Sequence, residues 1–326
     1  MELTILGSSA AAPVRERNLS AIVLRYRNNL ILFDCGEDTQ RRFIEAGIKL
    51  NKPLIICLSH FHADHVIGLP GLLFRFVLVE RDASLTIIGP KNLFLYLYLH
   101  KKILGLRTEY PLTIYEIDQE NQTLLQYDGL DSPLPSTTIP IQDQIIYEKK
   151  RYSIKYTPVN HSVNSFAYAF IEKPRYGRFH PEKARELGIP ESNLWKTLQQ
   201  GHTINYKGKE IDPLKEGIVD EQRPGRKITY SGDTKPCESL IELGMNSDIL
   251  IHESTFSKTL SNVAHEKLHS TAEDAAQDAQ KMNAKKLILT HISARYQDEA
   301  QELLDEAKKI FPDVVLAQDL MSFTIK

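Results

Sequence analysis

The chain has 326 residues, of which 42% are hydrophobic and 25% are charged. This composition is typical of a folded globular protein and excludes a fibrous or low-complexity chain, and the length accommodates either two ordinary domains or one large α/β domain with an insertion. The formal net charge of −2 excludes a uniformly basic protein that coats nucleic acid, so a nucleic-acid partner would need a local basic patch.

Short runs rich in branched residues and separated by turn residues predict strands along most of the chain. They lie at 2–6, 21–26, 29–34, 53–58, 85–88, 112–117, 153–159, 166–171, 227–230, 248–251, 286–290 and 314–317. Helices are expected between several of these strands, including 37–46, which ends at Gly47, a common residue after a helix. Another helix is expected over 270–282, where Ser270 and Glu273 match a capping box.

Three cysteines, Cys35, Cys57 and Cys237, are scattered along the chain. They give no readable disulfide framework and no CxxC zinc site, so any metal would be held by His and carboxylate side chains. The first residues, MELTILGSS, predict a strand and a turn and not a signal peptide. The most apolar stretch, 66–79, is too short to span a bilayer. We therefore expect a cytoplasmic protein that is not embedded in a membrane and uses no nucleotide cofactor.

The stretch 174–226 departs from the alternation of strands and helices because it is polar, rich in Pro, Gly, Lys and Arg, and weakly periodic. We expect it to form an insertion or arm outside the core. Residues 173–185, KPRYGRFHPEKAR, carry five basic side chains and one acidic side chain together with Tyr176 and Phe179. Basic and aromatic groups together suit an RNA backbone with stacked bases, and a solvated charged loop is the alternative.

A cluster of potential metal ligands follows the predicted strand 53–58 directly. His60, His62, Asp64 and His65 fall within the six residues HFHADH. Imidazole nitrogens and carboxylate oxygens are the ligands that zinc takes when no thiolate is offered. The two loop histidines can hold one metal, while Asp64 and His65 at the start of a helical turn can hold a second. A chance cluster is disfavoured by this order of residues after an apolar strand.

Further candidates follow from one rule: in α/β sheets, functional groups gather beyond the carboxyl ends of strands. They are His161, Asp233, His252 and His291. Taken singly, each could be a capping residue or an otherwise satisfied polar group. Their shared placement favours one site with two metals. His269 precedes the capping box and is not expected to be a ligand, although it could support one.

The ordered set of HxHxDH, a lone His, Gly-Asp-Thr and a late His resembles the ligand motifs of the metallo-β-lactamase fold. Four further segments, and the chain length, resemble the short form of the ribonuclease Z family of tRNA 3′-processing endonucleases. They are PVRERN at 13–18, similar to P-x-K-x-R-N with Arg for the usual Lys; HESTF at 252–256, similar to H-E-A-T-F; HISARY at 291–296, similar to H-x-S-x-R-Y; and KARELGIP at 183–190, similar to K-A-x-x-L-G-I-P. One departure is ESNLW at 191–195, where the family usually has a Gly-Pro motif.

The resemblance implies an α/β fold, a four-layer αββα sandwich. One metallo-β-lactamase-fold domain is expected over 1–326, with 174–226 as an inserted flexible arm that docks tRNA. It also implies a zinc-dependent endoribonuclease that removes the 3′ trailer from tRNA precursors and leaves a 3′-hydroxyl on the tRNA. Two zinc ions per subunit are expected, with manganese as the alternative, and a homodimer in which the arm of one subunit clamps tRNA bound to the other.

The resemblance assigns roles to the candidate residues. It gives one zinc to His60, His62 and His161, the other to Asp64, His65 and His291, and the bridging position to Asp233. Two such metals lower the pKa of a bridging water and brace an in-line attack on phosphorus. Asp64 is also a candidate general base. His252 is a candidate general acid for the leaving 3′-oxygen, oriented by Glu253.

Residues in two other motifs are expected to contact the RNA. Arg15, Arg17 and Asn18 would contact the acceptor end. Ser293 and Arg295 follow a metal ligand and would hold the scissile phosphate, which a planar guanidinium binds through two hydrogen bonds. Alternatively, Arg295 caps or pairs with the acidic helix that follows.

Two other functions remain open. A small-molecule hydrolase of the same fold, such as a phosphodiesterase, an arylsulfatase or a lactonase, would have no use for the basic arm. A non-catalytic RNA-binding member would have no use for the complete set of metal ligands.

Overall fold

The computed structural model of the chain describes residues 1–297 and 299–325. The chain divides into two compact units. The larger unit comprises Met1–Glu148, Ile154–Phe170 and Lys227–Lys326, and the smaller unit comprises Lys149–Ser153 and Ile171–Arg226. Among the described residues, no helix has both the length and the apolar character needed to cross a bilayer.

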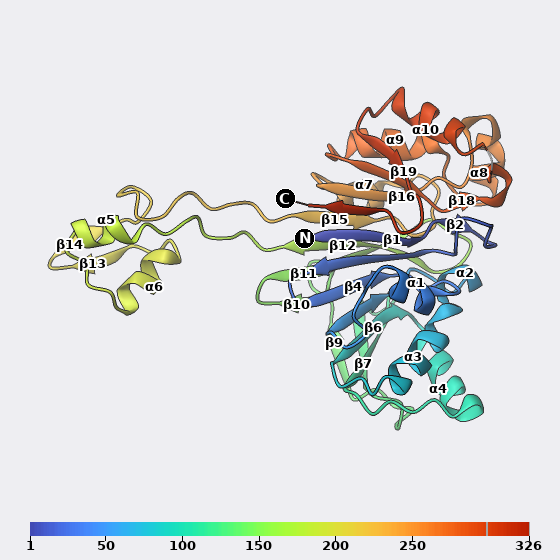
Figure 1. The fold of residues 1–326 in the computed structure, drawn as a ribbon, viewed down its shortest axis with the longest axis horizontal. Coiled ribbons are helices and arrows are strands. Elements are labelled where there is room, and N and C mark those ends of the chain that lie inside the picture. The colour runs from blue at the N-terminus through green and yellow to red at the C-terminus, as the bar shows by residue number, and fades with distance from the viewer. Residues whose placement is uncertain (298, 326) are drawn as a thin grey trace. The chain divides into compact units, whose positions relative to one another are not determined.

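Nine strands of the described residues form the first sheet (Figure 1). In order across the sheet they are β20 (Ser322–Thr324), β1 (Glu2–Gly7), β3 (Ala21–Tyr26), β4 (Asn29–Phe33), β5 (Leu54–Cys57), β6 (Leu85–Pro90), β7 (Leu112–Asp118), β8 (Thr123–Asp128) and β9 (Thr137–Pro140). Strands β4, β5, β6 and β7 run parallel, so their carboxyl ends share one edge. The HxHxDH segment leaves the sheet at this edge because it follows β5.

The second sheet contains seven strands within the described part of the chain. In order they are β10 (Ile145–Lys149), β11 (Tyr152–Val159), β12 (Ser165–Glu172), β15 (Lys227–Tyr230), β16 (Ile249–Glu253), β17 (Leu287–Thr290) and β19 (Val314–Leu316). Strands β15, β16, β17 and β19 run parallel. Their carboxyl ends therefore also meet at one edge, where functional groups gather in sheets of this kind.

Helices cover the outer face of each sheet in the larger unit (Figure 1). The first sheet carries α1 (Thr39–Glu45), α2 (Ala63–Val66), α3 (Gly68–Leu78) and α4 (Leu93–Leu104), and the second carries α7 (Glu238–Gly244), α8 (Ser261–Glu266), α9 (Ala272–Lys281) and α10 (Gln301–Lys308). The sheets face each other through buried aromatic side chains, since the rings of Phe33 and Tyr168 stack at 6.5 Å. The Tyr168 hydroxyl donates to the carbonyl oxygen of Leu58 at 2.6 Å. This is the expected four-layer αββα sandwich.

Shorter elements complete the larger unit. The strands β2 (Ser9–Ala10) and β18 (Ile292–Ser293) pair in parallel and so bring the segment after β1 beside the segment after β17. Two 3-10 helices, η1 (Lys258–Leu260) and η2 (Ala294–Tyr296), follow β16 and β18.

The predicted strands are present, with ends that differ by at most two residues. The predicted capping box is wrong by one residue. Thr271 caps α9 and exchanges hydrogen bonds with Asp274, whereas the Ser270 hydroxyl donates to the carbonyl oxygen of Thr234 at 2.7 Å. Strands β8, β9 and β10 were not predicted, and neither were the short strands of two or three residues β2, β13, β14, β18 and β20. Strand β9 is exposed or half-buried throughout, so it lacks the apolar alternation that predicts a strand.

The smaller unit has regular structure of its own. It contains α5 (Pro181–Glu186), α6 (Asn193–Gln199), β13 (Ile204–Tyr206) and β14 (Lys209–Ile211). They enclose a small core made of Ala184, Ile189, Leu198, Ile204, Ile211 and Ile218. The elements are only three to seven residues long, which explains the weak periodicity of the sequence. The divergent segment 191–195 starts α6, where the Ser192 side chain accepts a hydrogen bond from the backbone N–H of Leu194.

Candidate metal centre

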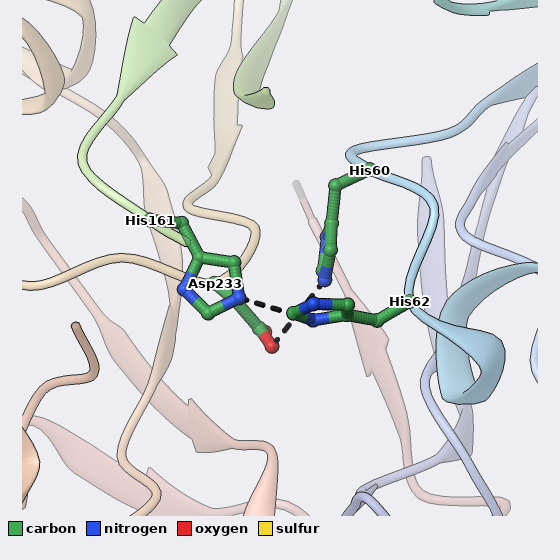
Figure 2. Close-up of side chains that lie close together, drawn as sticks. All are labelled: His60, His62, His161 and Asp233. Atoms are coloured by element: carbon green, nitrogen blue, oxygen red, sulfur yellow. Dashed lines mark hydrogen bonds and ion pairs between the residues drawn. The ribbon is translucent and has the colours of Figure 1, made fainter. Parts of the chain in front are cut away.

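The loops at the carboxyl edges of the two sheets bring all seven predicted metal ligands together. One group consists of His60, His62, His161 and Asp233, and the other of Asp64, His65 and His291, with the donor atoms of each group within 4.8 Å of one another. Figure 2 shows the first group, whose side chains converge from loops of both sheets. The rule that functional groups follow strand ends therefore identified residues that do lie together in the folded chain.

Asp233 lies between the two groups. Its Oδ2 atom is 3.2 Å from His65 Nε2, 3.3 Å from His291 Nε2 and 3.7 Å from His60 Nε2. The residue is 2% exposed, and its other carboxylate oxygen has no hydrogen-bond partner among the described residues. One carboxylate that faces histidines of both groups, with a second buried oxygen unsatisfied, is the geometry expected of a bridging ligand.

Contacts to the Nδ1 atoms orient the rings of four of the histidines. Four contacts do this: His65 to Asp34 Oδ2 at 2.7 Å, His60 to Ser59 Oγ at 2.9 Å, His161 to the Leu268 carbonyl at 3.0 Å and His291 to Thr255 Oγ1 at 2.9 Å. A carbonyl or carboxylate only accepts, and the Ser59 and Thr255 hydroxyls donate onward to Asp34 and Glu253. Each Nδ1 therefore carries the proton, and each Nε2 keeps a lone pair.

These lone pairs face one another across the site. His65 Nε2 lies 3.3 Å from His291 Nε2. Two unprotonated ring nitrogens at this distance repel each other unless a cation lies between them. A set of imidazole nitrogens and two carboxylates, with no thiolate, suits divalent zinc or manganese. The residues present thus fit the pair of metal ions that the motifs imply.

Asp34 is a functional residue that the sequence analysis missed. Its Oδ1 accepts the Ser59 backbone N–H at 2.6 Å, and its Oδ2 accepts the Ser59 and Tyr230 hydroxyls, each at 2.7 Å, in addition to the His65 ring N–H. Asp34 follows β4 directly and is fully buried. The rule that functional groups follow strand ends would have found it, since it ends the predicted strand 29–34.

The pKa values of Asp64 and His60 are shifted toward the charge states that bind metal. Burial by itself raises the pKa of Asp64, but the hydrogen bond with His291 and the charge of His65 outweigh it and lower that pKa. Burial and the neighbouring His65 lower the pKa of His60 well below its usual value. Asp64 is therefore ionised and His60 neutral at physiological pH, as coordination requires.

Glu253 forms a pair with His269 beside the metal ligands. Glu253 Oε1 accepts a hydrogen bond from His269 Nδ1 at 2.8 Å and another from the backbone N–H of Thr234 at 2.8 Å. The His269 ring lies 5.0 Å from the His161 ring and 5.5 Å from the His291 ring, between centroids. Burial lowers the pKa of His269, but Glu253 outweighs it and raises that pKa to about 9. His269 was expected at most to support a ligand, whereas the structure places its ring beside two of the predicted ligands.

The structure does not bring His252 into the site, which corrects the expectation for a proton donor there. Successive side chains of a strand point to opposite faces. On β16, Glu253 faces the metal ligands, and His252 faces α9 and Asp278. The His252 ring is fully buried, and its Nδ1 donates to the Glu253 carbonyl at 2.6 Å. The partner that Glu253 orients is therefore His269.

The loop with the PVRERN motif adjoins the site. The backbone N–H of Ala11 donates to Asp64 Oδ2 at 2.7 Å. Arg17 donates to Ser8 Oγ at 2.8 Å, and the backbone N–H of Asn18 donates to Asp319 Oδ2 at 2.7 Å, so both residues are tied into the protein. Arg15 is exposed and lines a pocket of about 410 Å³ together with Arg17, Gln297 and Gln318. Arg15 is the accessible cation of the motif.

Ser293 and Arg295 lie on the segment after His291. Ser293 belongs to β18 and pairs with Ala10 of β2, and Arg295 is exposed. The Arg295 guanidinium carbon lies 5.0 Å from the centre of the Phe256 ring. This cation–π contact holds the side chain in place.

Comparison with known proteins agrees with the fold and the site. A family model described as anti-Pycsar protein Apyc1 matches residues 1–173, and a β-lactamase superfamily domain model matches residues 216–292. The structure is similar to the crystal structure of human tRNase Z, short form, with a TM-score of 0.67, 25% identity and complete coverage of both chains. It also shares its fold with YhfI from Bacillus subtilis, with a TM-score of 0.64, 17% identity and coverage of 99% and 98%. The chain is thus a metallo-β-lactamase-fold protein with clusters of His and Asp side chains suited to a divalent metal.

Curated relatives match the chain over its whole length. Ribonuclease Z of Nitrosopumilus maritimus is 38% identical over 326 residues, with 100% of both sequences covered. Ribonuclease Z of Methanosarcina mazei is 35% identical, with 100% of this chain and 98% of the relative covered. The chain belongs to the ribonuclease Z family.

Proposed function

We propose that this chain is a metal-dependent endoribonuclease that removes the 3′ trailer from tRNA precursors, leaving a 3′-hydroxyl on the tRNA and a 5′-phosphate on the trailer. Membership of the ribonuclease Z family supports this function. The observation that carries it is the converged set of seven ligands around Asp233, with the ring nitrogens aimed inward from four hydrogen-bonded histidines. A non-catalytic RNA-binding protein would have no need of that set.

The proposed ligand sets are His60, His62 and His161 for one zinc ion, and Asp64, His65 and His291 for the other, with Asp233 between them. Manganese suits the same donors. When bound, a pair of divalent ions supplies Lewis acidity and lowers the pKa of a water molecule. The protein's own part is to fix the ligands through Asp34, Ser59 and Thr255.

We assign proton transfer to two groups. Asp64, which is ionised and anchored by the Ala11 N–H, is the proposed acceptor. His269 replaces His252 as the proposed donor to the leaving 3′-oxygen, because its ring lies beside the ligands His161 and His291 while Glu253 holds its Nδ1 atom. The His269 Nε2 atom would then donate the proton to the leaving 3′-oxygen.

RNA binding is proposed for three surfaces. Ser293 and Arg295 would hold the scissile phosphate, and Arg15, Arg17 and Asn18 would meet the acceptor end. The arm, residues 174–226, would dock the tRNA body. Within the arm, Phe179 packs on Trp195 at 5.3 Å and belongs to the small core, whereas Tyr176 is 48% exposed and free to stack on a base.

A homodimer in the cytoplasm is the proposed setting. The helix α4 exposes four apolar side chains, three of them at every fourth residue. They are Leu95, Leu99, Ile103 and Leu104. Exposed apolar patches of this kind mark association surfaces, which supports a subunit contact on this side of the larger unit.

The decisive experiment is incubation with a tRNA precursor that carries a 3′ trailer, with and without a chelator. Chelator-sensitive cleavage after the discriminator base is expected, and trimming by single nucleotides would contradict an endonuclease. Deletion of 174–226 separates the proposal from a small-molecule hydrolase. The Glu172 N–H donates to the Arg226 carbonyl at 2.8 Å, so a short linker can join the ends. Turnover of bis(p-nitrophenyl) phosphate should survive this deletion while tRNA cleavage falls sharply.

A further inference from the structure

Two buried charged side chains take no part in the proposed chemistry: His252 of β16 and Asp278 of α9. They are 0% and 1% exposed, and His252 Nε2 lies 3.6 Å from Asp278 Oδ2. Within the described residues, neither this ring nitrogen nor either carboxylate oxygen has a hydrogen-bond partner. Burying a charge pair with so few additional hydrogen bonds is costly. A role beyond simple packing would explain why the pair is there.

The helix α9 packs on the second sheet through a face of small residues. Ala272, Ala275, Ala276 and Ala279 are all fully buried. Methyl groups interlock less than larger side chains, so this face constrains the position of the helix along β16 only weakly. Backbone hydrogen bonds between Phe256 and both Ser270 and Ala272 hold the start of the helix. The His252–Asp278 pair adds a polar constraint further along the helix that fits in one register.

Both members of the His269–Glu253 pair are connected to this contact. Glu253 is the next residue after His252 on β16, and the His252 ring N–H donates to the Glu253 carbonyl at 2.6 Å. His269 lies two residues before Thr271, which caps α9. A shift of α9 along β16 would therefore move His269 relative to the Glu253 carboxylate.

We propose that His252 and Asp278 are positioning residues that lock α9 onto β16 and thereby hold His269 against Glu253. The proposal rests on the proposed function, in which His269 protonates the leaving 3′-oxygen. Burial lowers the pKa of His252, but Asp278 and the Glu253 carbonyl outweigh it and raise that pKa, which favours an ionic pair. His252, the first residue of the HESTF motif, thus influences the reaction indirectly, by holding His269 against Glu253, the second residue of the motif.

The test compares two phosphodiesters that differ in their leaving group. The 3′-oxygen of a tRNA precursor needs a proton to leave, whereas p-nitrophenolate leaves bis(p-nitrophenyl) phosphate without one. In the Asp278→Asn protein we expect kcat for the tRNA precursor to fall by about tenfold or more, because general acids contribute on the order of 10²–10⁴-fold. The KM for tRNA and the turnover of bis(p-nitrophenyl) phosphate should stay within about twofold of the wild-type values.

Further variants guard against a simple loss of folding. His252→Gln should show the same split between the substrates, and the double variant His252→Gln/Asp278→Asn should recover part of the loss, since two amides can pair. Lys281→Ala removes the exposed cation 3.6 Å from Asp278 Oδ1 and should leave both rates unchanged. Equal losses on both substrates, or a double variant no better than the product of the singles, would overturn the proposal. Failure of the wild-type protein to cut the precursor would instead refute the proposed function.

Discussion

Asp34 shows how much of a metal site depends on residues that touch no metal. It accepts hydrogen bonds from the backbone and hydroxyl of Ser59, from the Tyr230 hydroxyl and from the His65 ring. These donors come from separate loops and strands of both sheets. The carboxylate therefore fixes the tautomer and direction of His65 and connects the two sheets at the site.

We expect Asp34→Asn to weaken zinc binding by about 10–100-fold, because the His65 ring loses its charged acceptor. Competition with a chromophoric chelator measures the change. Tyr230→Phe is the matched control, since it removes one donor and leaves the His65 contact in place. Equal weakening by the two variants would show that the His65 contact is not the cause.

We expect Asp64→Ala to abolish cleavage with little loss of tRNA binding, because the residue is a proposed metal ligand and proton acceptor and is not among the residues proposed to contact the RNA. Cleavage assays and filter binding measure the two effects. Asp131→Ala changes a carboxylate whose side chain is 94% exposed and should alter neither. Normal cleavage by the Asp64→Ala protein would refute the assigned site.

At the scale of elements, strand β16 and helix α9 mark where sequence reasoning succeeded and failed. Placement after strand ends located Asp233 and His291, because the parallel strands β15 and β17 bring their carboxyl ends to one edge. It also located His161, which follows β11. The same rule included His252, because it does not show which face a side chain occupies. In ILIHE every residue is buried, so no polar alternation reveals the orientation. His269 was undervalued because it precedes a helix, and only the folded chain brings it beside Glu253.

Thr271 fixes the first turn of α9 through a reciprocal pair of hydrogen bonds with Asp274. Thr271→Ala should lower the free energy of unfolding by about 1 kcal/mol, the usual effect of losing an N-cap side chain. Urea denaturation measures this change. Thr271→Ser keeps the capping hydroxyl and should restore most of the stability. A loss just as large in the serine variant would point to the methyl group and not to the cap.

At the scale of the molecule, the metal centre joins loops from both sheets, so ligand binding and folding are coupled. Burial lowers the pKa of His65, but Asp233 and Asp34 outweigh it and raise that pKa well above its usual value, so without metal a proton on His65 takes the place of the ion beside His291. We expect a chelator to lower Tm and added zinc to restore it, because an ion that binds only the folded state stabilises that state. Calorimetry measures the shift. Asp233→Asn should show a much smaller shift, and an equal one would place the metal elsewhere.

The proposed dimer can be tested through the stripe on α4. Leu99→Glu together with Ile103→Glu should convert a dimer into monomers, because charges replace two exposed apolar contacts. Analytical ultracentrifugation gives the mass. Leu134→Glu, at a residue that is 72% exposed and outside the stripe, is the control and should leave the dimer intact. A dimer that survives the α4 changes would place the interface on another surface.

The ends of the segment 173–225 adjoin, since the Glu172 N–H is bonded to the Arg226 carbonyl. The smaller unit also has its own apolar core. A segment with adjoining ends and an independent core can be gained, lost or exchanged in one genetic event without disturbing the host sheet. Under the proposed role of the arm in docking tRNA, substrate choice and bond cleavage can therefore evolve separately, and transplanting 174–226 between relatives is a direct way to engineer new RNA preferences.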